Sequence, residues 1–113
     1  MHRFLGAAVV IASIGATVAP TSAAQEEGLA GMHSWRRVGG RTCFSDHSHD
    51  GSGTGSSRRQ AEGAAIRNWI SFTALEYGNA WAHYSMAVGK TMRCDSSGQS
   101  WWCSTEAYPC RGR

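Results

Sequence analysis

The sequence lacks the short motifs that identify most enzyme families. It contains no Gly-x-Ser-x-Gly and no His-Glu-x-x-His, and the glycines over 51–55 lack the Lys-Ser/Thr that a phosphate-binding loop requires. It also has no Cys-x-x-Cys pair of the kind that binds zinc. The histidines and arginines would suit the acid–base chemistry of a small secreted nuclease, but no motif brings them together. We therefore favour a protein that is not an enzyme.

Charge of either sign is also scarce. The chain has 11 Lys and Arg against 8 Asp and Glu, with a formal net charge of +3 at pH 7. This net positive charge is too small to indicate nucleic acid as a partner. Beyond the first apolar run, no stretch is long enough to cross a membrane.

The N-terminus has the pattern of a secretory signal peptide. A short basic start precedes an apolar run over 4–18, Pro20 interrupts it, and small residues follow over 21–24. We expect 1–23 to be cleaved, so that the mature chain is periplasmic or secreted. An uncleaved membrane anchor is the alternative, but about 15 apolar residues is short for a span of roughly 20.

All four cysteines lie beyond this signal. In an exported chain they indicate two disulfides rather than a metal site. Of the three pairings that four cysteines allow, we prefer Cys94 with Cys103 and Cys43 with Cys110, while pairings of Cys103 or Cys94 with Cys110 stay open. Each bridge stabilises by roughly 2–4 kcal/mol. Stabilisation by disulfides matters here because a mature chain of about ninety residues buries only a modest hydrophobic core.

Hydrophobic periodicity predicts an α+β fold. Apolar residues at helical spacing predict one long amphipathic helix over about 58–77, with Ser57 as its N-cap. Gly63 in its interior would mark a close approach of another backbone. A short helix is expected over 80–87. A period of two then predicts an antiparallel, disulfide-linked β-hairpin over about 90–107, on which the long helix packs.

The segment before the helix, 24–56, has no such period. Its composition predicts a loose N-terminal arm and then a flexible linker rich in Gly, Ser and His, which leads into a small disulfide-stabilised domain over 57–113. Within the arm, Trp35 and Phe44 are large apolar residues. We expect the arm to be a peripheral strand or to lie over the core.

Strand alternation separates the two adjacent tryptophans of the hairpin. Neighbouring residues point to opposite faces, so Trp101 faces the helix and Trp102 falls on the polar face with Arg93 and Glu106. We interpret Trp102, Arg93 and Glu106 as a ligand-binding group that stacks on a sugar ring, a peptide or a partner protein. The alternative is that the arm folds over Trp102.

The predicted linker contains a second candidate site. Two imidazoles and two carboxylates lie within five residues: Asp46, His47, His49 and Asp50. This donor set can hold zinc or copper, and His33 or His83 would complete it. The competing interpretation is a solvated polar loop.

A further pattern spans about half of the chain. It consists of Trp69, Tyr77-Gly78, Trp81, Ala87, Cys94, Cys103 and Pro109-Cys110. In this pattern the chain resembles small exported proteins of Gram-negative bacteria in which a helix precedes a Cys-containing hairpin. The resemblance implies no activity, cofactor or site residue. The predicted function is a non-catalytic binding or structural module of the cell envelope, whose partner is an envelope component or a protein. The alternative is a zinc- or copper-binding protein.

Overall fold

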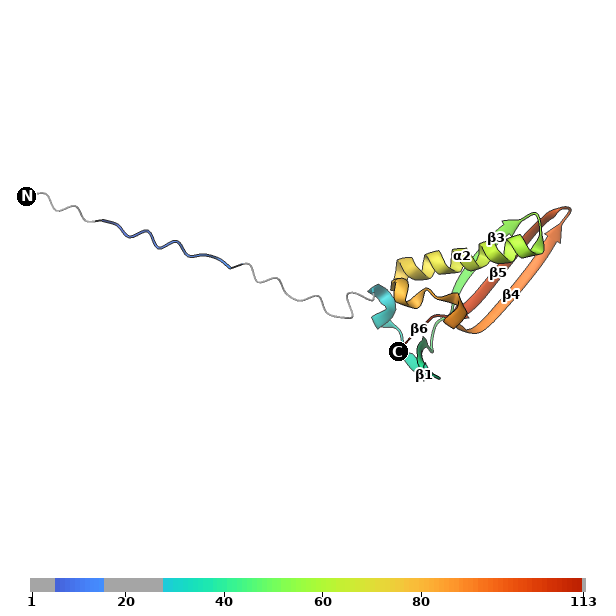
Figure 1. Ribbon diagram of the computed structural model, residues 1–113, viewed down its shortest axis with the longest axis horizontal. Coiled ribbons are helices and arrows are strands. Elements are labelled where there is room, and N and C mark those ends of the chain that lie inside the picture. Colours follow the sequence, from blue (N-terminus) through green and yellow to red (C-terminus); the bar gives the residue numbers. More distant parts are fainter. Residues whose placement is uncertain (1–5, 16–27, 113) are drawn as a thin grey trace, which may run out of the picture.

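The computed structural model describes residues 6–15 and 28–112 (Figure 1). Residues 6–15 have no regular secondary structure, and their large apolar side chains are exposed. The end of the predicted signal peptide lies outside the described residues. Within the two described ranges, no helix is both long and apolar enough to span a membrane.

Residues 28–112 confirm the α+β class (Figure 1). The elements in chain order are the 3₁₀ turn η1 (Gly28–Met32), strands β1 (Trp35–Val38), β2 (Arg41–Phe44) and β3 (His49–Gly55), helix α2 (Arg58–Tyr77), the 3₁₀ turns η2 (Asn79–Trp81) and η3 (Tyr84–Met86), and strands β4 (Val88–Ser97), β5 (Ser100–Tyr108) and β6 (Cys110–Gly112). They form two antiparallel sheets with strand orders β3-β5-β4 and β1-β2-β6.

Helix α2 has the bounds that the sequence predicts. The Ser57 side chain accepts a hydrogen bond from the backbone N–H of Gln60 at 3.2 Å, which caps the first turn. At the other end Gly78 has a φ of 93°, and its N–H donates to the Ala74 carbonyl at 2.9 Å. A positive φ is accessible to glycine at little cost, so the helix ends there.

One side of α2 is buried against the larger sheet. The buried residues recur at four-residue steps: Ala61, Ala65, Trp69, Thr73 and Tyr77. They pack over β3 as well as β5, so the predicted packing of the helix on the 90–107 hairpin is incomplete. A third strand, β3, pairs with β5 and lies beneath the helix.

Strand β3 shows that the predicted flexible linker before the helix is wrong over His49–Gly55. Three alternate residues of the strand face the helix: Gly51, Gly53 and Gly55. A Cβ on Gly53 would lie 2.6 Å from the Ala65 backbone nitrogen, so only glycine lets the two backbones approach this closely. The approach predicted at Gly63 is absent among the described residues, because a Cβ there would meet only the Arg67 guanidinium at 3.2 Å.

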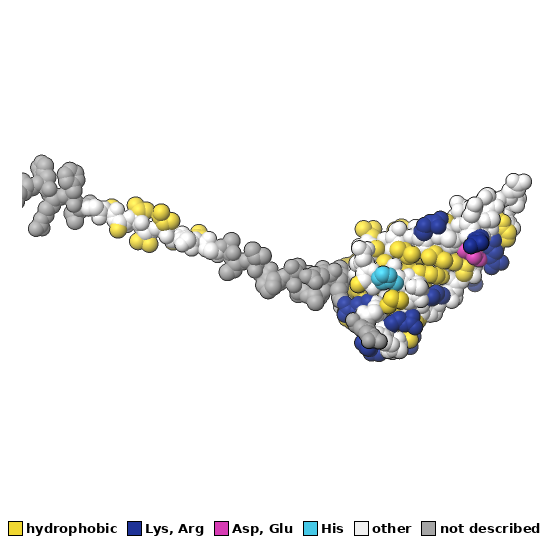
Figure 2. Space-filling model, viewed as in Figure 1, with side chains coloured by type: hydrophobic (Ala, Val, Ile, Leu, Met, Phe, Trp, Pro, Cys, Tyr) yellow, Lys and Arg dark blue, Asp and Glu magenta, His cyan; other side chains and the backbone are white. Residues whose placement is uncertain are grey.

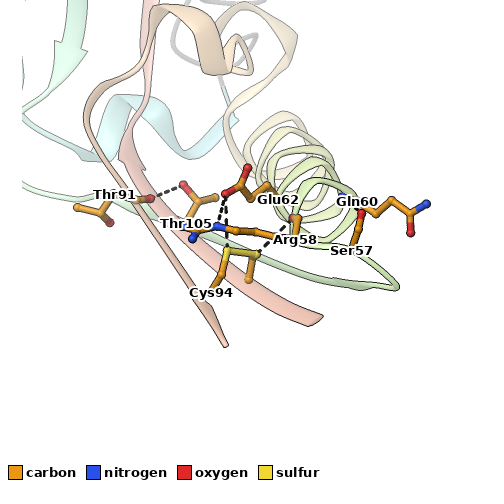
Figure 3. The surroundings of a disulfide bond; sticks show 8 residues. Ser57, Arg58, Gln60, Glu62, Thr91, Cys94 and Thr105 are labelled. Carbon is orange, nitrogen blue, oxygen red and sulfur yellow. Dashed lines mark hydrogen bonds and ion pairs between the residues drawn. A yellow bond between two sulfur atoms is a disulfide. The ribbon is translucent and has the colours of Figure 1, made fainter. Parts of the chain in front are cut away.

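The hairpin of β4 and β5 sets the cysteine pairing. A two-residue turn begins at Gly98, which has a φ of 62°, and this register places Cys94 opposite Cys103. These two cysteines form the hairpin disulfide, and Cys43 and Cys110 form the arm disulfide between β2 and β6. The preferred pairing is therefore confirmed. Figure 3 shows the hairpin disulfide beside the first turn of α2.

The arm over 33–44 is ordered and belongs to the core. Strands β1 and β2 pair with each other, and β6 joins them from the C-terminus. Phe44 is fully buried, with ring centroids 4.7 Å from both Tyr77 and Trp81. Trp35 packs on Trp81 at 5.1 Å. These contacts make the arm a small sheet of its own, so neither of its aromatic residues covers the polar face of the hairpin.

Two short segments also differ from expectation. The predicted helix over 80–87 is replaced by the separate turns η2 and η3, because His83 between them has the extended backbone angles φ −107° and ψ 94°. Part of the predicted loose arm forms η1, whose Ala30 is fully buried. The indole N–H of Trp35 donates to the Ala30 carbonyl at 2.9 Å, which fixes η1 against β1.

Candidate functional site

The larger sheet has one face under α2 and one face in solvent. The register places three cross-strand rows on the solvent side, which we call the open face: Thr54–Trp102–Asp95, Ser52–Ser104–Arg93 and Asp50–Glu106–Thr91. Ser104 is half-buried and the other eight residues are exposed. Eight of these nine side chains are polar, and the ninth is a large aromatic residue in the row nearest the hairpin turn.

Trp102 is that aromatic residue, and its side chain is 44% exposed. Its neighbour Trp101 points to the opposite face, where it packs against the cluster that contains Ala61 and Ala65. The prediction that alternation separates the two tryptophans is confirmed. The alternative, in which the arm covers Trp102, is wrong because Trp35 and the rest of the arm pack at the other sheet.

A second feature of the open face is a hollow in the two rows next to Trp102. It is lined by Thr91, Arg93, Ser104 and Glu106. Neither the Arg93 guanidinium nor the Glu106 carboxylate forms a hydrogen bond or ion pair with any residue that the structure describes. The structure thus brings the three predicted ligand-binding residues to one surface, where two of them have charged groups without a protein partner.

The sequence interpretation missed the part of this surface that β3 supplies. Asp50, Ser52 and Thr54 alternate with the glycines that face α2. This period of two was the signal that could have identified a strand, with a glycine face and a polar face. The high content of Gly and Ser obscured it.

Strand β3 also separates the residues that the sequence predicts as zinc or copper ligands. His49 is 8% exposed and points inward, with its ring nitrogens 3.3 Å from Thr73 Oγ1 and 3.2 Å from Glu76 Oε2. Asp50 follows directly and points to the open face. The four predicted ligands therefore do not converge. In the described part of the chain, no three His, Cys, Asp or Glu side chains are placed to hold a metal ion.

The remaining two candidate ligands lie at the junction of the arm and α2. His47 stacks on His33, with ring centroids 5.0 Å apart. Asp46 Oδ1 is 3.4 Å from His33 Nδ1, and its Oδ2 accepts a hydrogen bond from the Ser34 N–H at 3.1 Å. The Ser34 hydrogen bond is the main cause that lowers the pKa of Asp46. His33 Nε2 lies 3.4 Å from the Tyr77 hydroxyl, so this group fastens the arm to the end of the helix.

A larger hollow of about 540 Å³ lies between β3 and the C-terminal half of α2. Several of its polar groups are already paired within the protein. The Ser52 N–H donates a hydrogen bond to Asn68 Oδ1 at 2.8 Å. The Glu76 carboxylate is hydrogen-bonded to the His49 ring at 3.2 Å. The lining also includes four residues of the open face, so this hollow adjoins the open face at strand β3: Asp50, Ser52, Ser104 and Glu106.

A scan of protein-family models, a search among curated proteins and a search among solved structures each found no match to this chain. The open face is therefore the feature of the molecule that bears on its function.

Proposed function

We propose that the chain is an exported, disulfide-stabilised binding module without catalytic activity, and that it binds its ligand on the open face. The observation that carries this proposal is Trp102, a large aromatic residue left 44% exposed on the central strand β5. Keeping apolar area in water forgoes the stabilisation that burial provides, and aromatic residues are enriched at recognition surfaces. Arg93 lies in the next cross-strand row and Glu106 in the row after that, and neither has a partner among the described residues.

The disulfides support export. All four cysteines are paired, so the chain has no free thiol. Structural disulfides are typical of proteins that fold outside the reducing cytosol. This agrees with the signal peptide predicted from the N-terminus, and it supports a periplasmic or secreted module of the cell envelope.

The chemistry of the open face favours a glycan over a protein partner. The core of a protein interface has several apolar anchors, whereas the open face has one, Trp102, among hydroxyl and charged side chains. A pyranose ring has a face of C–H groups that packs on an aromatic ring. Its hydroxyl groups can then exchange hydrogen bonds with serine, threonine, carboxylate and guanidinium groups at the edge.

The charge of the open face restricts the glycan further. Three carboxylates, those of Asp50, Asp95 and Glu106, accompany the single guanidinium of Arg93. Like charges repel at short range, so an acidic or sulfated sugar is disfavoured there. We therefore expect neutral, N-acetylated or amino sugars to bind most strongly.

A glycan array tests this proposal. The protein is purified from an exporting host in the processed form it takes there, and Trp102→Ala is compared with Leu75→Ala. Leu75 is a suitable control because it is 81% exposed on α2 and lines no hollow that open-face residues share. We expect the wild type and Leu75→Ala to bind the same neutral or amino glycans, and Trp102→Ala to lose about tenfold or more in affinity. Absence of any glycan binding by the wild type, or equal losses in both variants, contradicts the proposal.

A further inference from the structure

The smaller sheet carries charge of one sign. Its three strands contain no Asp or Glu and four arginines: Arg36, Arg37, Arg41 and Arg111. Figure 2 shows Lys and Arg side chains gathered at the end of the domain where β1 lies. Within the described residues, Arg36, Arg37 and Arg41 form no ion pair with a carboxylate. This end of the domain is therefore electropositive.

Aromatic side chains lie among these arginines. Arg37, Thr42 and Arg111 form one cross-strand row, and alternation places Trp35 on the same face. The Arg111 guanidinium is 5.0 Å from the centre of the Trp35 ring and 5.2 Å from that of Trp81. Such cation–π contacts hold the charged group beside an apolar surface. Trp35 itself is 36% exposed.

Turn η1 adds exposed apolar side chains at the same place. The hydrogen bond from the Trp35 indole to the Ala30 carbonyl holds η1 against β1. Leu29 on this turn is 50% exposed and Met32 is 79% exposed. Alternation sends Arg36 and Arg41 to the opposite face of the smaller sheet, and the Arg41 guanidinium donates to the Met86 carbonyl at 2.7 Å. We call the region around Trp35 the basic end, and it comprises Arg37, Arg111, Leu29, Met32 and Trp35.

We propose that the basic end binds the surface of a bilayer that contains anionic phospholipids. The arginines would be attracted to the phosphate groups, and guanidinium pairs with phosphate through two hydrogen bonds. Trp35, Leu29 and Met32 would enter the interfacial region, where tryptophan is favoured and apolar side chains leave water. A soluble polyanion would use the arginines but leave Leu29 and Met32 in water. The combination of charge and exposed apolar area therefore fits a bilayer better.

Two single arginines provide a matched experiment. Arg37→Gln removes one charge from the basic end, and Arg59→Gln removes one charge from an exposed residue at the start of α2 that forms no ion pair within the described residues. Sedimentation measures binding of the processed protein to vesicles of phosphatidylcholine alone or with phosphatidylglycerol. Each basic residue at an anionic surface changes partitioning by about fivefold. We expect the first variant to lose binding to the anionic vesicles by about fivefold, and the second to lose less than twofold.

A third variant distinguishes a bilayer from a soluble polyanion. Met32→Ser removes exposed apolar area and no charge, so it should weaken vesicle binding several-fold and leave binding to heparin unchanged. Equal losses in the two arginine variants would overturn the proposal. So would binding to heparin without binding to anionic vesicles, or equal binding to both kinds of vesicle. None of these outcomes depends on Trp102, so the glycan proposal is tested separately.

Discussion

Replacing Gly53 by alanine tests the close packing of α2 on β3. Local preference alone favours the change, because alanine loses less conformational entropy than glycine in a strand, by roughly 0.5–1 kcal/mol. Gly53 also has no positive φ that would oppose a side chain. The new Cβ, however, would lie 2.6 Å from backbone atoms of both Ala64 and Ala65. Carbon atoms in contact normally lie about 3.5–4.0 Å apart, so the helix must move by about 1 Å.

The cost of this movement exceeds the local gain. The obstructing atoms belong to the backbone of α2, which cannot rotate away as a side chain could. Moving the helix also disturbs its contacts with Gly51 and Gly55, which lie under the same helix. Overpacking of this kind costs about 1–3 kcal/mol, and the upper part of that range applies here. After the local gain is subtracted, we expect a loss of about 2 kcal/mol in the free energy of unfolding, or a Tm lower by about 10 °C.

Gly63→Ala is the matched control, since it is the same substitution inside α2. Its Cβ would meet only the flexible end of Arg67, at 3.2 Å. We expect this variant to be more stable than the wild type by roughly 0.5–1 kcal/mol. Urea unfolding with the disulfides intact measures both changes. The reasoning is refuted if Gly53→Ala is as stable as the wild type, or if both substitutions shift stability in the same direction.

Two further predictions concern stability. Removing the arm disulfide by paired Cys→Ala changes should cost more than removing the hairpin disulfide, about 4.4 against about 2.6 kcal/mol from chain entropy, because the bridged residues are 67 and 9 positions apart. Equal losses in denaturant unfolding would contradict this. Burial, and next the Glu76 carboxylate, raise the pKa of Tyr77 from 10.0 to about 12. The contribution of Tyr77 is therefore complete below pH 10 and should decline as the pH rises from 10 through 12. A Tyr77→Phe variant that shows the same decline would contradict it.

The helix and the hairpin could be predicted because their determinants are local. The Ser57 cap and the four-residue steps define α2 within 20 residues. In the hairpin, the turn at Gly98 fixes the register, and the register fixes both the Cys94–Cys103 pairing and the side to which Trp102 points. The part of the open face that β4 and β5 supply followed from this short-range reasoning.

The other parts of the fold and of the candidate site depend on contacts between segments that are distant in the sequence. Strand β3 reads as a linker by composition, and its glycines acquire a role only when α2 lies on them. The smaller sheet pairs 41–44 with 110–112, and no local pattern marks that pairing. The sequence interpretation likewise weighed arginines by their number, whereas the structure gathers Arg36, Arg37 and Arg111 into one sheet.

The two proposed surfaces lie on different sheets that share a rigid connection. Strand β5 of the larger sheet ends at Tyr108, and β6 of the smaller sheet begins at Cys110, so only Pro109 separates them. The Pro109 carbonyl accepts a hydrogen bond from the Phe44 N–H at 2.9 Å, and the arm disulfide closes the same corner. A short rigid joint holds both surfaces at a fixed separation. If each surface binds weakly, simultaneous contact with a glycan and a bilayer converts the second event into an intramolecular one and raises the overall affinity.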